Sequence, residues 1–344
     1  MIDLRKSLVP SPELHLVEAV PGDPWERDLQ PSIEAPPDAD QAPAPEARWD
    51  GQAARTGICG TVSPRVLVLP NGNYRMYYSQ MLPRAGNPAG ANDYDHCTTR
   101  ILSAYSTDGF KWTPEPGVRL SAEAGGAGDY RVVSSEVVPT GDGRLRMYYE
   151  CCCGPQSVQN TILSAVSDDG LKWTREPGAR IESEGRNVSS PRIIFFPGNL
   201  CRMYFLERGE GIRSAVSHDG LHFTTEPGVR IAQDSTHDAM VAFAPEIFEV
   251  AGKGYTMFYA GYASAERSSI LRADSVDGLS WNKSAKPILS PGGKWDAAKS
   301  SEMCLYPLPK TTSSRARYRM VYEACDGTAM NKRGVWRIAG ATST

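Results

Sequence analysis

Apolar and aromatic segments recur along the chain in a fixed order. Each aromatic segment contains Tyr, a residue that is enriched in strands. Five of them lie at residues 75–78, 146–149, 202–205, 256–259 and 319–322. Each follows an apolar segment that contains Pro64-Arg65-Val66, Ser135-Glu136-Val137, Pro191-Arg192-Ile193, Pro245-Glu246-Ile247 or Ser301-Glu302-Met303. The pattern predicts five pairs of antiparallel strands.

A third repeated element follows four of these pairs. It consists of a Ser/Ala strand, an Asp-Gly turn and an aromatic residue, at 101–112, 162–173, 212–223 and 270–281. Gly accepts the positive φ of a tight hairpin, and Asp bonds the turn backbone. We expect the aromatic ring to pack on the next repeat. Because the same turn recurs in four repeats, it cannot by itself define a single functional site, and we expect its role to be structural.

Four short antiparallel strands per repeat are typical of a propeller blade, so the sequence predicts an all-β, five-bladed β-propeller. The last repeat ends in Ile338-Ala339-Gly340-Ala341-Thr342-Ser343, where a third strand belongs. An N-terminal strand, expected near residues 14–20, would close the fifth blade and cover its open edge. We divide the chain into a closing segment at 1–29, a Pro-rich connector at 30–54 and the propeller at 55–344.

Composition narrows the possible partners. The net charge is −3 and no basic stripe is present, which argues against nucleic acid and anionic membranes. The first residues lack the apolar run of a secretory signal, and no segment approaches the roughly 20 apolar residues of a membrane span. We expect a soluble, cytoplasmic protein that acts on a small molecule.

The cysteines include the consecutive run Cys151-Cys152-Cys153, with His96-Cys97 in a neighbouring loop. Consecutive residues of a strand point to opposite sides, and the chain has no Cys-x-x-Cys pair. We therefore expect reduced thiols, no metal site and no cofactor.

A charged residue near the start of each innermost strand carries the candidate chemistry: Arg65, Glu136, Arg192, Glu246 and Glu302. Such charges are costly to bury unless they are paired or hydrated. They indicate either a plug of structural ion pairs or a polar pocket for a small molecule. Two facing carboxyl groups can work as a general acid and a general base, and we expect Glu246 as the acid and Glu136 or Glu302 as the base. Arg65 and Arg192 favour an anionic group on the substrate.

The divergent loops that lead into the innermost strands supply further candidates. His237 and Asp238 are candidates for positioning the substrate. Tyr130 and Trp295 are candidates for stacking on a ring face of the ligand.

Strand-start acids, Tyr-rich second strands and Ser-x-Asp-Gly-x-x-Trp turns over five repeats resemble the five-bladed glycoside hydrolase superfamily. That superfamily includes arabinanases and xylosidases, invertases and levansucrases, and mannoside phosphorylases. The resemblance covers about residues 55–344 and implies a carbohydrate-active, glycosidase-type enzyme acting on a small glycoside, with an anionic one as an option. Those hydrolases usually carry a first-blade Asp as base or nucleophile, whereas this chain has Ser63-Pro64-Arg65 there.

Two other classes of function stay open at this point. One is a lyase, isomerase or cyclase that uses the same Glu/Arg pocket on a small anionic molecule. The other is a noncatalytic binding propeller.

Overall fold

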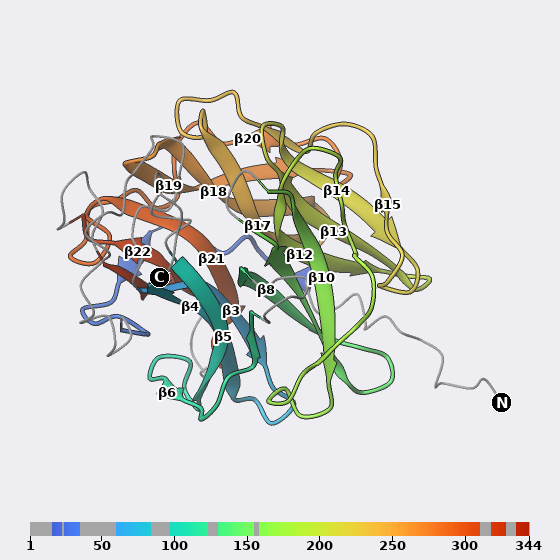
Figure 1. Ribbon diagram of the computed structural model, residues 1–344. Coiled ribbons are helices and arrows are strands. Elements are labelled where there is room, and N and C mark those ends of the chain that lie inside the picture. Colours follow the sequence, from blue (N-terminus) through green and yellow to red (C-terminus); the bar gives the residue numbers. More distant parts are fainter. Residues whose placement is uncertain are drawn as a thin grey trace.

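The computed structural model describes residues 16–22, 24–34, 60–83, 97–122, 130–154, 158–309, 318–327 and 335–343. These residues form strands and turns and no helix, so the all-β class is confirmed (Figure 1). In this part of the chain, therefore, no helix is long and apolar enough to cross a membrane.

Three long antiparallel strands recur five times, and we call each group a unit. The units are β3 (Gly60–Val68), β4 (Tyr74–Pro83) and β5 (Cys97–Ser106); β8 (Arg131–Pro139), β9 (Leu145–Cys152) and β10 (Asn160–Ser167); β12 (Val188–Phe196), β13 (Leu200–Glu207) and β14 (Gly211–Ser217); β17 (Val241–Val250), β18 (Gly254–Ser264) and β19 (Arg267–Ser275); and β21 (Lys299–Pro307), β22 (Tyr318–Cys325) and β23 (Trp336–Ser343).

Short strands complete the outer edges of the first four units. They are β6 (Thr113–Pro114), β7 (Leu120–Ser121), β11 (Thr174–Arg175), β15 (Thr224–Thr225), β16 (Ile231–Ala232) and β20 (Asn282–Lys283). In three units an outer Glu forms a two-bonded ion pair with the Arg that begins the aromatic motif, as Glu115 does with Arg75, where both distances are 2.9 Å.

The N-terminal segment supplies the outer strand of the fifth unit. Strand β2 (Trp25–Arg27) runs antiparallel to β23, with Trp25 opposite Ser343. Directly after this strand, Asp28 forms an ion pair with the fully buried Arg319, with 3.1 Å from Arg319 Nη1 to Asp28 Oδ1. This pair corresponds to the pair of Glu115 with Arg75 in the first unit. The strand expected near residues 14–20 lies elsewhere, because β1 (Leu16–Val17) pairs in parallel with β17.

The Asp-Gly turns have the structural role that the sequence predicts. Asp108 Oδ1 accepts the backbone N–H groups of Phe110 and Lys111 at 2.7 and 2.8 Å, and Gly109 has a φ of 76°. The aromatic ring packs on the preceding unit, however, and not on the next one: Trp173 lies edge-on to Tyr77, with 5.8 Å between ring centroids.

The first strands of the units lie together in the middle of the view in Figure 1, where β3, β8, β12, β17 and β21 are labelled. Each contacts the next in chain order, and β21 contacts β3. In addition, the Tyr306 hydroxyl of the fifth unit donates to the Gly109 carbonyl of the first at 2.7 Å. Because neighbours cover both faces, the first strands are buried at nearly every residue.

Candidate active site

A β-bulge interrupts each first strand near its start and determines which side chains share one level. In each unit, one residue just after the bulge lies opposite the third residue of the aromatic motif. In the first four units, in order, this residue is Arg65, Glu136, Arg192 and Glu246. In β21 this residue is Cys304, opposite Val321. The expectation that Glu302 shares their register is therefore wrong, because Glu302 lies two residues earlier, at the level of Ser63.

A backbone contact supports this register. The Ile193 N–H donates to Glu136 Oε1 at 3.2 Å, from the third unit to the second. The Val66 N–H contacts Cys304 Sγ in the same way at 3.3 Å, from the first unit to the fifth. Cys304 thus occupies the fifth place of the level formed by the four charged residues.

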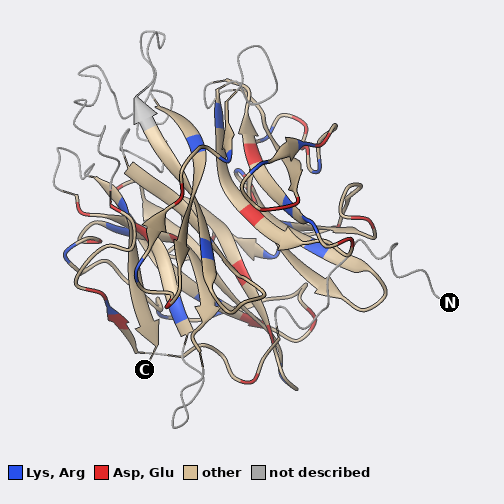
Figure 2. Ribbon diagram, turned by 90° about the horizontal axis from the view of Figure 1, so that it is seen from below, with Lys and Arg blue, Asp and Glu red and all other residues tan. Residues whose placement is uncertain are grey.

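Despite this offset, the structure brings all five charged candidates into one network. Arg65 pairs with Glu246 and also with Glu136, at 3.1 Å from Nη2 to Oε1. Arg192 joins Glu302 at 3.2 Å and lies 3.7 Å from Glu246. No side chain of the five is more than 9% exposed. Basic residues (blue) and acidic residues (red) lie on the long strands as well as on the loops (Figure 2).

Glu246 is the central carboxyl group of this network. Burial raises its pKa to about 7, with a smaller contribution from Glu136, although Arg65 and Arg192 both act to lower it. A carboxyl with a pKa near neutral can both donate and accept a proton.

The neutral residue at this level is Cys304. Burial raises the pKa of its thiol to about 12, so it carries no charge near neutral pH. In chain order, the side chains at this level are therefore basic, acidic, basic and acidic from Arg65 to Glu246, and the fifth, Cys304, is uncharged. This arrangement avoids a third carboxylate beside Glu136 and Glu246 at the same level.

A second level lies nearer the start of the strands and has a strained backbone. Ser63, Ser134, Ser190 and Ala244 occupy equivalent positions with φ between 50° and 55°. This left-handed conformation costs roughly 1–2 kcal/mol for each residue other than Gly. Strain of this kind is found at functional sites, where the surrounding structure enforces it.

Two buried carboxyl groups of the fifth unit meet at Ser63. Its hydroxyl lies 2.9 Å from Glu302 Oε2, and its N–H donates to Glu323 Oε1 at 2.9 Å. Ser134 Oγ lies 3.3 Å from the same Glu302 oxygen, and the Ser301 hydroxyl donates to Glu323 at 2.7 Å. The sequence pattern missed Ser63, Ser134 and Cys304. Counting back 13 residues from Met76 and Met147 reaches Ser63 and Ser134, but Cys304 lies 16 residues before Met320, whereas Arg65 lies only 11 before Met76, so the same count does not find it.

His237 and Asp238 are positioned by contacts within the fourth unit. Asp238 is fully buried and accepts from Ser235, from the Tyr259 hydroxyl at 3.1 Å and from Lys283 at 2.7 Å. His237 is partly buried, and its N–H contacts Ser235. These contacts give Asp238 a structural part, and none of them involves the five charged residues.

The two aromatic candidates lie in other surroundings. Tyr130 is 7% exposed and packs in an apolar cluster with Arg131 over its ring, which leaves little surface for a ligand. Trp295 donates to the Leu29 carbonyl at 3.2 Å and lines a separate pocket beside the N-terminal segment.

Of the cysteine run, Cys151 and Cys152 are buried and Cys153 is exposed. Burial raises the pKa of Cys151 to about 12. His96, the proposed neighbour, lies outside the described residues. Among those that are described, no group of His, Cys, Asp and Glu side chains is arranged to hold a metal ion.

Comparison with solved structures identifies the class of fold. A thermostable family-43 glycoside hydrolase is similar with a TM-score of 0.64 and 17% identity, over 83% of this chain and 90% of that one. A family-117 glycoside hydrolase from the marine bacterium Zobellia galactanivorans is similar with a TM-score of 0.60 and 18% identity, over 86% and 87%.

A third similar structure comes from the family-130 mannoside phosphorylases, described as containing glycoside hydrolases that target β-1,2 mannosidic linkages in Candida mannan. It has a TM-score of 0.60 and 14% identity, over 94% of this chain and 96% of that one. No protein-family model and no curated protein matches the chain. The resemblance to the propeller glycoside hydrolases is thus confirmed at the level of the fold.

Proposed function

We propose that this protein is a carbohydrate-active enzyme of glycosidase type, with its active site where the first strands begin. The observation that carries the proposal is Glu246, a buried carboxyl with a pKa raised to about 7 inside a cluster of other carboxyl groups. A general acid works best when its pKa lies near the working pH. The fold shared with family-43, family-117 and family-130 structures supports this class of chemistry.

The proposal includes a closed, five-bladed propeller whose fifth blade is completed by β2. Three contacts support closure: β21 lies against β3, Tyr306 reaches Gly109 of the first unit, and β2 pairs with β23. Closure places the charged residues around one central channel, with the second level of Ser63 and Glu302 nearer its mouth.

In the proposed reaction, Glu246 gives its proton to the oxygen of the leaving group. Glu302 accepts a proton from the water whose oxygen bonds to the anomeric carbon, so a glycoside and water become a free sugar and an alcohol. We favour Glu302 over Glu136 as the base because Glu302 lies at the level nearer the strand starts, beside the Ser63 and Ser134 hydroxyls. Each of the two also pairs with an Arg, Glu302 with Arg192 and Glu136 with Arg65, and Glu136 in addition accepts the Ile193 N–H.

The charge of the network bears on the substrate. Arg65 and Arg192 already pair with Glu136, Glu246 and Glu302, so an anionic substrate group would have to displace a carboxylate. With Glu246 protonated, these five side chains sum to no net charge. The pairing favours a neutral sugar ring at the reacting position over an anionic one.

The test is release of sugar from a panel of aryl glycosides and disaccharides by the wild-type protein and Glu246→Gln. Loss of a general acid should lower turnover by about 10²–10⁴-fold. Asp142→Asn, a change at an ion pair on a distant turn, is the control and should leave turnover unchanged. Unchanged turnover in Glu246→Gln would refute the assignment. Binding of a glycoside without cleavage by the wild type would favour a noncatalytic propeller instead.

A further inference from the structure

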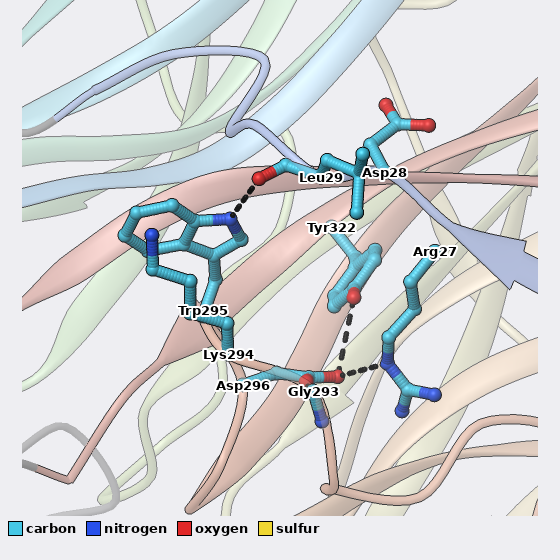
Figure 3. Close-up of a pocket in the computed structure, with 8 residues that line it drawn as sticks. All are labelled: Arg27, Asp28, Leu29, Gly293, Lys294, Trp295, Asp296 and Tyr322. Carbon is cyan, nitrogen blue, oxygen red and sulfur yellow. Dashed lines mark hydrogen bonds and ion pairs between the residues drawn. The ribbon is translucent and has the colours of Figure 1, made fainter.

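A small pocket lies between the N-terminal segment and the loop that leads into β21 (Figure 3). Its volume is about 190 Å³, and its walls come from Arg27–Leu29 on one side and Gly293–Asp296 on the other, with Tyr322 between them. A cavity of roughly 150 Å³ is enough for one six-membered ring. The pocket is therefore large enough for a single ring with a small substituent.

The polar wall of the pocket is held rigidly. Asp296 is 1% exposed and accepts from Arg27 Nε at 3.0 Å and from the Tyr322 hydroxyl at 3.1 Å (Figure 3). It also accepts from the Ser300 hydroxyl at 2.9 Å. The Gly293 N–H donates to its other oxygen at 2.7 Å. These donors occupy both oxygens, so Asp296 orients Arg27 and has little capacity left for a ligand.

Four charged residues line the pocket, and their charges sum to zero: Arg27, Asp28, Lys294 and Asp296. Asp296 pairs with Arg27, and Asp28 pairs with Arg319 outside the pocket. Lys294 is exposed, and its ammonium has no carboxylate partner within the described part of the chain. A ligand that pairs with this ammonium carries a negative charge.

Apolar surface lies beside this charge. Lys294 Nζ lies 4.1 Å from the centre of the Trp295 ring, and Leu29 on the opposite side is 87% exposed. Lys294 is exposed, so its contact with the half-buried indole is weak and the ammonium can turn from the ring toward an anion. The Arg337 guanidinium also lies 4.9 Å from the centre of this ring. Leu29 and the part of the indole that Arg337 does not cover are then available to contact the body of the ligand.

We propose that this pocket binds a small carboxylate with a ring-sized body, such as the uronic acid unit of an acidic glycan. Lys294 pairs with the carboxylate, and Trp295 and Leu29 pack against the ring. The choice of a sugar acid over another ring carboxylate rests on the proposed function, whereas the carboxylate itself follows from the pocket alone. Because Arg27–Leu29 form one wall, binding also holds the N-terminal segment against the fifth unit.

Isothermal titration of the full chain with methyl glucuronide, cyclohexanecarboxylate and methyl glucoside tests this proposal. We expect methyl glucuronide to bind with an affinity of about 1 mM, and neutral methyl glucoside about tenfold more weakly. Lys294→Gln should weaken both carboxylates by about tenfold and leave methyl glucoside unchanged, since only the ion pair is lost. Lys286→Gln, a change of another exposed Lys, is the matched control.

Each outcome decides a part of the proposal. Equal binding of the two carboxylates identifies the ligand as a ring carboxylate in general, and preference for methyl glucuronide identifies it as a sugar acid. Failure of both to bind, or equal affinity in Lys294→Gln and the wild type, would overturn the site. Glu246→Gln should bind as the wild type does, so this result is independent of the proposed catalytic function.

Discussion

Replacing Asp28 by Asn tests how the N-terminal segment is attached. Arg319 is fully buried, and its guanidinium pairs with Asp28 through both terminal nitrogens. Breaking a buried ion pair by removal of one partner costs about 3–5 kcal/mol. The Asp28 side chain is 26% exposed and Asn keeps one acceptor, so we expect a smaller loss, of about 2 kcal/mol.

This loss corresponds to a measurable shift in melting temperature. At roughly 2.1 cal/mol/K per residue, a chain of this length has an unfolding entropy of about 0.7 kcal/mol/K, so Asp28→Asn should lower Tm by about 3 °C. Glu34→Gln is the matched control, because Glu34 also pairs with an Arg of the fifth unit but is 58% exposed. An exposed pair contributes about 0–1 kcal/mol. Equal melting of the two variants in a calorimeter would refute the reasoning.

Two further predictions concern the Asp-Gly turn at Gly170 and the carboxyl group that acts as the base in the proposed reaction. Gly170→Ala should destabilise the fold more than Gly143→Ala does, because a Cβ at Gly170 meets Tyr77 Oη at 2.6 Å and a Cβ at Gly143 meets nothing within 4 Å; equal denaturant midpoints would contradict this. Glu302→Gln should lower turnover by about 10²-fold or more, whereas Glu136→Gln should change turnover much less; both variants should lower Tm, because each removes one partner of a buried ion pair. Kinetics of the two variants distinguish the two roles.

The repeated features of the fold could be predicted because their cause is local. The turn around Gly109 depends on hydrogen bonds from Asp108 to the next residues, so the same short motif gives the same structure in every unit. No local motif marks the residues that form the outer strand of the fifth unit. That strand is Trp25–Arg27, and it is followed by Asp28, which pairs with Arg319. Because Asp28 and Arg319 are far apart in the sequence, a local pattern could not indicate this contact.

The candidate site was predicted in its composition but not in its register. Glu302 was aligned with Glu246 by charge, whereas the bulge in β21 puts Cys304 at that level. Cys304 carries no charge near neutral pH, so a search for charged side chains passed over it. Trp295 lies in a separate pocket because its loop packs on the N-terminal segment, a contact that no local pattern indicates.

The most direct test of the proposed catalytic role of Glu246 is the pH dependence of kcat/KM on a glycoside that the wild-type protein cleaves. The acid must be protonated to donate, and burial raises its pKa to about 7. We therefore predict that kcat/KM falls by about tenfold for each pH unit above about 7, and that this descending limb is absent in Glu246→Gln. A wild-type profile that stays flat through this range, or the same descending limb in the variant, would contradict the account.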